Sequence, residues 1–157
     1  MTFELISYVG LDVFSFESSR KDIHDILGTP DRNIKSSGRK IIQDVWYEKG
    51  LYLFFDSELM REINIRPLIH PDDTIVGDSI KFIFLNYDIF SMPPDHIYSE
   101  LCKIDGNPIK TAGTTVLLNL GVSLYGFDNY SFNEQDERSF GLFRRGLWDD
   151  ILNQGAS

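Results

Sequence analysis

The segment spanning residues 11–31 contains signals for both ends of one helix. Ser19 and Asp22 form a capping box, because the hydroxyl can accept a hydrogen bond from a free backbone N–H and the carboxylate favours the positive end of the helix. Gly28 can take the left-handed conformation that closes a last turn, and the proline two residues later cannot continue a helix. The pattern predicts a helix over residues 19–27, with a turn of the chain on either side.

The same signature recurs in the second half of the chain. The Asp-x-Phe-Ser motif at residues 12–15 returns at 88–91, and the Gly-x-Pro stop at 28–30 returns at 106–108. A hydrophobic extended stretch follows each copy. We interpret the recurrence as one structural unit used twice. The alternative is two small units whose helices have similar start and stop residues by chance.

Hydrophobic alternation places strands around these helices. In the first half we predict strands at residues 3–9, 41–47, 51–55 and 59–65, with a polar loop or turn at 32–40. In the second half we predict a strand at 80–86, a helix starting near residues 93–95, a hairpin within 114–127 and a last strand at 139–144.

The predicted fold class is therefore α+β. It is a tandem repeat of strand, helix and three-stranded antiparallel meander, with the helices packed on one face of the sheet. The whole chain, 1–157, would form a single domain of two similar units, about 1–66 and 79–150, joined by a turn-rich segment at 67–78.

Composition limits the classes of function. A net charge of −9 disfavours nucleic acid as a direct ligand, because neutralising phosphates requires clustered Lys and Arg. Cys102 is the only cysteine, which excludes an intramolecular disulfide and fits a reducing compartment. No stretch resembles a signal peptide or is long enough to span a bilayer, so we expect a cytoplasmic protein without membrane contact. The sequence does not indicate an oligomeric state.

Few residues are candidates for metal binding or catalysis. The three histidines, His24, His70 and His96, lack a second ligand at metal-binding spacing. The run from His70 to Asp73 is the best candidate for a metal or acid/base cluster, and a solvated turn is the alternative because Pro and Asp favour turns. The sequence contains no Gly-rich phosphate loop and no nucleophile elbow. We expect no catalytic activity and no cofactor or metal.

Large apolar side chains occupy both faces of the strand predicted at 51–55. Either a second layer covers the face away from the helices, or that face binds a partner. A binding surface there would combine aromatic and acidic residues, namely Asp44, Trp46, Tyr52, Phe54 and Glu62. Aromatic groups supply desolvated contact area and carboxylates attract a basic partner. In the alternative these aromatics form a second core layer, for which Phe54 is a better candidate than Trp46.

A family resemblance rests on the capped helix ending in Leu-Gly-Thr-Pro-Asp, followed by the motifs at 44–47, 50–56 and 59–63. This pattern resembles small bacterial immunity proteins of contact-dependent growth inhibition and other polymorphic toxin systems. The doubled unit also resembles the β-lactamase inhibitor protein fold and, in single copy, the outer-membrane assembly lipoproteins. The resemblance covers residues 11–65 well and the second half loosely.

The resemblance implies a cytoplasmic immunity protein that neutralises a cognate bacterial toxin domain by stoichiometric binding. The acidic balance agrees, since an acidic protein associates quickly with a basic domain such as a nuclease. The alternatives are a non-catalytic protein-interaction or assembly module, and an enzyme that uses the segment from His70 to Asp73. A neighbouring gene for a large toxin would separate these hypotheses.

Overall fold

The computed structural model describes residues 1–38, 40–67, 80–128 and 137–149, which form an α+β fold. In the first half the elements are β1 (Thr2–Ile6), β2 (Gly10–Leu11), α1 (Arg20–Leu27), β3 (Arg32–Lys35), β4 (Ile41–Trp46), the 3-10 turn η1 (Tyr47–Lys49), β5 (Leu51–Asp56) and β6 (Leu59–Ile65). In the second half they are β7 (Lys81–Phe84), β8 (Tyr87–Asp88), α2 (Pro94–Asp105), β9 (Ile109–Thr111), β10 (Thr114–Leu117), β11 (Val122–Tyr125) and β12 (Ser139–Phe143).

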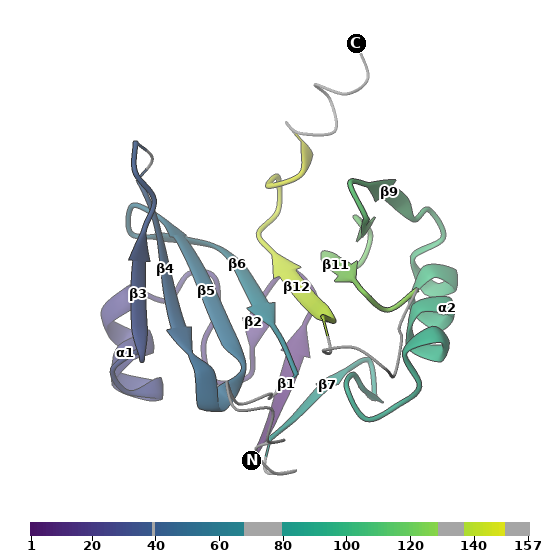
Figure 1. Cartoon of the computed structure of the whole chain (residues 1–157), viewed down its shortest axis with the longest axis horizontal. Helices are drawn as coiled ribbons and strands as arrows, with labels where there is room; N and C mark the ends of the chain where they lie inside the picture. The colour runs from purple at the N-terminus through teal and green to yellow at the C-terminus, as the bar shows by residue number, and fades with distance from the viewer. Residues whose placement is uncertain (39, 68–79, 129–136, 150–157) are drawn as a thin grey trace.

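These strands form two sheets that both halves share. The larger sheet has eight strands in the order β3-β4-β5-β6-β12-β11-β10-β9, and every neighbouring pair is antiparallel. Its centre is the β6·β12 pair, which joins the two halves (Figure 1). The smaller sheet has the order β2-β1-β7-β8, with β1 parallel to β7. The two halves are therefore hydrogen-bonded to each other in both sheets.

Both helices begin and end where their boundary residues predict. Ser19 caps α1, because its hydroxyl accepts from the backbone N–H of Asp22 at 3.1 Å. Gly28 ends α1 with a φ of 88° and an extended ψ, and Gly106 ends α2 in the left-handed conformation with a φ of 82°. Pro94 stands in the first turn of α2, where its missing N–H is not needed. The prediction for the first helix is confirmed.

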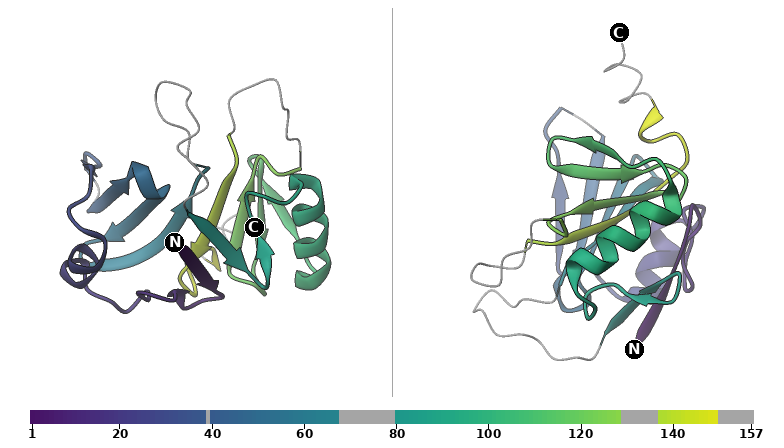
Figure 2. Two further views of the ribbon diagram at one scale, coloured as in Figure 1. Left: turned by 90° about the horizontal axis from the view of Figure 1, so that it is seen from below. Right: turned by 90° about the vertical axis from the view of Figure 1, so that its right-hand side faces the viewer.

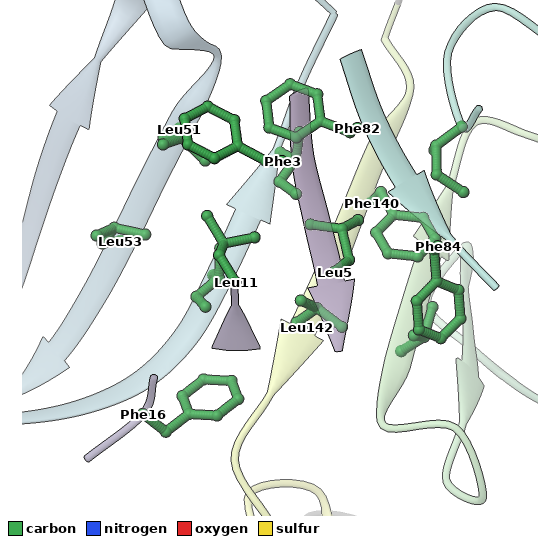
Figure 3. Packing of buried hydrophobic residues seen from close by; sticks show 14 of the residues in the cluster. Phe3, Leu5, Leu11, Phe16, Leu51, Leu53, Phe82, Phe84, Phe140 and Leu142 are labelled. Atoms are coloured by element: carbon green, nitrogen blue, oxygen red, sulfur yellow. The ribbon is translucent and has the colours of Figure 1, made fainter. Parts of the chain in front are cut away.

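One face of the eight-stranded sheet, the inner face, carries the core. Paired residues form a buried row across six of its strands: Trp46, Leu51, Ile65, Phe140, Leu124 and Thr115. The small sheet lies over this face, and Figure 3 shows Phe3, Leu5 and Leu11 among the large-sheet side chains. Burying each such side chain contributes about 1.5–3 kcal/mol.

Each helix also contacts a residue of this inner row. The Trp46 indole donates to the carbonyl of Gly28 at the end of α1 (3.1 Å), and the Tyr98 hydroxyl of α2 lies 3.0 Å from the Thr115 hydroxyl. Figures 1 and 2 show α1 beside the first-half strands and α2 beside the second-half strands.

Two edge strands depart from the sequence prediction. The polar stretch 32–40 was expected to be a loop or turn, but Arg32–Lys35 is strand β3, paired with β4. Its exposed charged side chains are compatible with a sheet edge, where one side of the strand faces water. At the other edge β9 was not predicted. The first strand ends at Ile6 instead of residue 9, because Tyr8 takes a positive φ of 60° in the turn to β2.

Candidate functional site

The five residues predicted to form a binding patch lie on opposite faces of the eight-stranded sheet. Strand register pairs Asp44 with Leu53 and Trp46 with Leu51, which places both on the inner face. They are 0% and 2% exposed. Tyr52, Phe54 and Glu62 lie on the other face, called here the outer face, and are half-buried. The prediction of one joint patch is wrong, because parity relates residues within one strand, whereas the register between strands decides which residues of neighbouring strands share a face.

Asp44 is the centre of a buried polar cluster beneath α1. Its carboxylate accepts two hydrogen bonds from Arg20, at 2.7 and 2.8 Å, and one from the Asn33 amide at 2.6 Å. His24 Nε2 lies 2.8 Å from the same carboxylate, and the His24 ring meets Trp46 edge-on. Arg20 and His24 share one helix face at i, i+4 spacing. The cluster fastens α1 and β3 to β4, so its role is structural.

The outer face is organised around a second transverse row. Val45, Tyr52, Asn64, Gly141, Ser123 and Val116 are paired in succession across six strands. Between β6 and β10 this face is hollowed, with a volume of about 550 Å³. The lining combines sheet residues with side chains that flank β12, among them Glu137, Arg138 and Trp148. We call this feature the hollow.

Gly141 lies against two residues that line the hollow, Glu62 and Ser123. A Cβ on Gly141 would collide with the Ser123 hydroxyl and lie 3.1 Å from Glu62 Oε1. Beside it, the Ser139 hydroxyl donates to Asn64 Oδ1 at 2.6 Å. The absence of a side chain at this one position leaves room for the polar groups of both halves at the seam between β6 and β12.

Aromatic side chains border the hollow on both sides. On the first-half side the guanidinium carbon of Arg66 lies 4.2 Å from the Tyr52 ring centroid, and Arg66 also donates to Asn64 at 3.3 Å. On the second-half side Tyr125 is 43% exposed. Arginine stacked on tyrosine is a typical component of protein-binding surfaces.

Among the described residues that line the hollow, carboxylates and guanidinium groups are balanced in number. Two carboxylates, Glu62 and Glu137, face two guanidinium groups, Arg66 and Arg138. The lining therefore differs from the acidic and aromatic patch expected from the sequence, because guanidinium groups match its carboxylates. Burial raises the pKa of Glu62 above its ordinary value, and a hydrogen bond with Asn64 and the nearby Arg61 and Arg66 offset only part of this effect.

The predicted chemical candidates give no active site among the described residues. His70 to Asp73 lies outside the described residues, as does nearly all of the joint at 67–78. Among the described residues, no group of three His, Cys, Asp or Glu side chains is placed to hold a metal ion. Cys102 is partly buried, which raises the pKa of its thiol. Within the described ranges no helix is both long and apolar enough to cross a membrane.

Comparison with known proteins adds no relative. No protein-family model, no curated protein sequence and no solved structure matches this chain.

Proposed function

We propose that this protein binds another protein through the outer face of its eight-stranded sheet, and that the partner is a bacterial toxin domain that it neutralises stoichiometrically. The observation that carries the proposal is the hollow with its aromatic borders at Tyr52 and Tyr125. The proposal that the partner is a toxin rests on the resemblance of residues 11–65 to immunity proteins. With this proposal we expect the protein in the bacterial cytoplasm.

The composition of the outer face suits protein recognition. Tyr and Arg are enriched among residues that dominate binding energy, and Phe54 adds apolar area next to them. The stack of Arg66 on Tyr52 holds both side chains in place before binding, so less conformational entropy is lost on association. The same features would serve a non-catalytic assembly module, which is the alternative.

Charge has a separate role in this proposal. The hollow is balanced, whereas the whole chain carries −9, so the long-range field favours a basic partner while the outer face supplies the contacts. A toxin that acts on nucleic acid has the basic surface that such a field attracts. Association should therefore slow as salt rises.

The architecture proposed with this function is a tandem repeat. The element order strand, strand, helix and four strands occurs at residues 2–65 and again at 81–143. We infer that the chain is one domain made from two copies of one unit, with both helices on the inner face. Superposing the two halves tests this, and a different spatial path of the strands in the two halves would contradict it.

The test of function uses a toxin domain, which we expect to be encoded by a gene next to that of this chain. Co-expression of this chain should restore growth of cells that express the toxin domain, and the purified proteins should form a 1:1 complex in calorimetry. Continued toxicity without a complex would contradict the immunity proposal. A complex with a non-toxic neighbour protein would instead favour the assembly module.

A further inference from the structure

We propose that the hollow receives a lysine or arginine side chain of the partner protein, with Glu62 as its counter-ion. The inference rests on the proposed function, because it specifies what the partner inserts into the outer face. It is carried by the placement of Glu62, by the contacts that the nearby arginines make with other groups, and by an indole N–H in the same hollow for which the described residues provide no acceptor.

Glu62 is an acid to which no described residue supplies a paired cation. It lies beside Gly141 at the seam of the two halves. Across the described ranges no Lys, Arg or His forms an ion pair with it. A desolvated carboxylate in this state is unfavourable, and a cation brought by a partner offsets that penalty with its charge and hydrogen bonds.

The two arginines that line the hollow are directed to other groups. Arg66 is stacked on Tyr52 and donates to Asn64. Arg138 donates to the carbonyl of Phe90 at 3.4 Å, and its guanidinium carbon lies 5.3 Å from that residue's ring centroid. Neither arginine forms an ion pair with Glu62, although Arg66, like Arg61, partly offsets the effect of burial on its pKa.

The hollow also contains an indole N–H donor, from which a free metal cation cannot accept a hydrogen bond. Trp148 Nε1 is buried, and none of the described residues provides it with an acceptor. A peptide segment carries both groups that the hollow lacks: a cationic side chain for Glu62 and a backbone carbonyl for the indole. The volume of about 550 Å³ is within the range of sites that enclose small ligands or side chains. These features favour a protein side chain over a free cation.

The direct test uses Nα-acetyl-arginine amide and Nα-acetyl-lysine amide as probes, both of which keep a cationic side chain. The matched neutral probe is N-acetyl-citrulline amide, which has the shape of the arginine probe without its charge. The carboxyl carbon of Glu62, followed by NMR, should titrate at lower pH when either cationic probe is bound. Glu62→Gln should weaken the cationic probes about tenfold and leave the citrulline probe unchanged. Glu58→Gln, an exposed acid in the β5–β6 turn, is the control variant.

Several results would overturn the inference. Equal binding of the arginine and citrulline probes would show that charge is not recognised. Equal affinity of Glu62→Gln and wild type for the arginine probe would show that Glu62 is not the counter-ion. Guanidinium chloride binding as tightly as the arginine probe at equal ionic strength would identify a small-cation site instead.

The toxin domain separates failure of this inference from failure of the proposed function. If Glu62→Gln binds the toxin domain with wild-type affinity while Tyr52→Ala does not, the outer face binds the partner but the hollow does not receive its cation. If neither variant changes affinity, the outer face is not the interface and both proposals fail.

Discussion

Asp44 gives the sharpest prediction about stability, because a fully buried carboxylate there is held by three side chains. Replacing it with asparagine keeps its size but removes the charge that faces Arg20. Breaking a buried ion pair from one side costs about 3–5 kcal/mol. The lower end applies here, since Arg20 and His24 are 24% and 29% exposed and can recover some hydration.

We therefore expect Asp44→Asn to lower the free energy of unfolding by about 3 kcal/mol. For a chain of this length that corresponds to a fall in melting temperature of about 6–12 °C. Urea denaturation and calorimetry measure both quantities. The matched control is Asp25→Asn, which removes an exposed pair with Lys21 and should leave the free energy of unfolding nearly unchanged.

The pH dependence of Asp44 has a defined sign. Burial alone would raise its pKa, but hydrogen bonds from Arg20, His24 and Asn33 outweigh burial, so the pKa lies below its ordinary value of 3.8. A depressed pKa contributes stability that is complete above the unfolded value and is lost as pH falls through the folded value. The difference between wild type and Asp44→Asn should therefore be constant near neutral pH and shrink below about pH 4. A loss under about 1 kcal/mol, or a difference that persists at low pH, would refute the reasoning.

Three further predictions concern the hollow and the first helix. Glu62→Gln should raise the melting temperature at pH 7 and leave it unchanged near pH 4, because a raised carboxyl pKa means that stability falls as the group ionises; a drop at pH 7 would contradict this. Gly141→Ala should destabilise by about 1–3 kcal/mol through its collision with the Ser123 hydroxyl. If Gly141→Ala combined with Ser123→Ala is no more stable than Gly141→Ala alone, that collision is not the cause. Ser19→Ala should cost about 1 kcal/mol by removing the helix cap, seen in urea denaturation, and no loss would show that the cap is replaced by water.

Local signals in the sequence predicted much of the fold. Ser19 and Gly28 mark the ends of α1 because capping depends on residues within one turn of the helix. The hairpin of β4 and β5 and the strand β6 follow from alternation over short spans. The edge strand β3 could not be predicted in this way, since its residues are polar and its strand form depends on hydrogen bonds to β4.

The site was harder to predict because it is built from distant parts of the chain. A charged residue is usually exposed, so Asp44 was assigned to the surface, and only its contacts with Arg20 and Asn33 make burial possible. Trp46 lies on the same inner face, because it is two residues from Asp44 on one strand. Phe54, which the sequence favoured as a core residue, lies on the outer face. The hollow depends on the pairing of β6 with β12, whose residues Asn64 and Gly141 are brought together only by the fold.

The central claim, that the outer face of the eight-stranded sheet binds the partner, is tested most directly by calorimetric titration of the toxin domain into four proteins. These are wild type, Tyr52→Ala, Phe54→Ala and Ile104→Ala, the last on the exposed surface of α2. We expect the Tyr52 and Phe54 variants each to weaken binding by about 2 kcal/mol, or roughly thirtyfold, and the Ile104 variant to bind like wild type. Unchanged affinity at both outer-face positions, with all four proteins folded, would contradict the account.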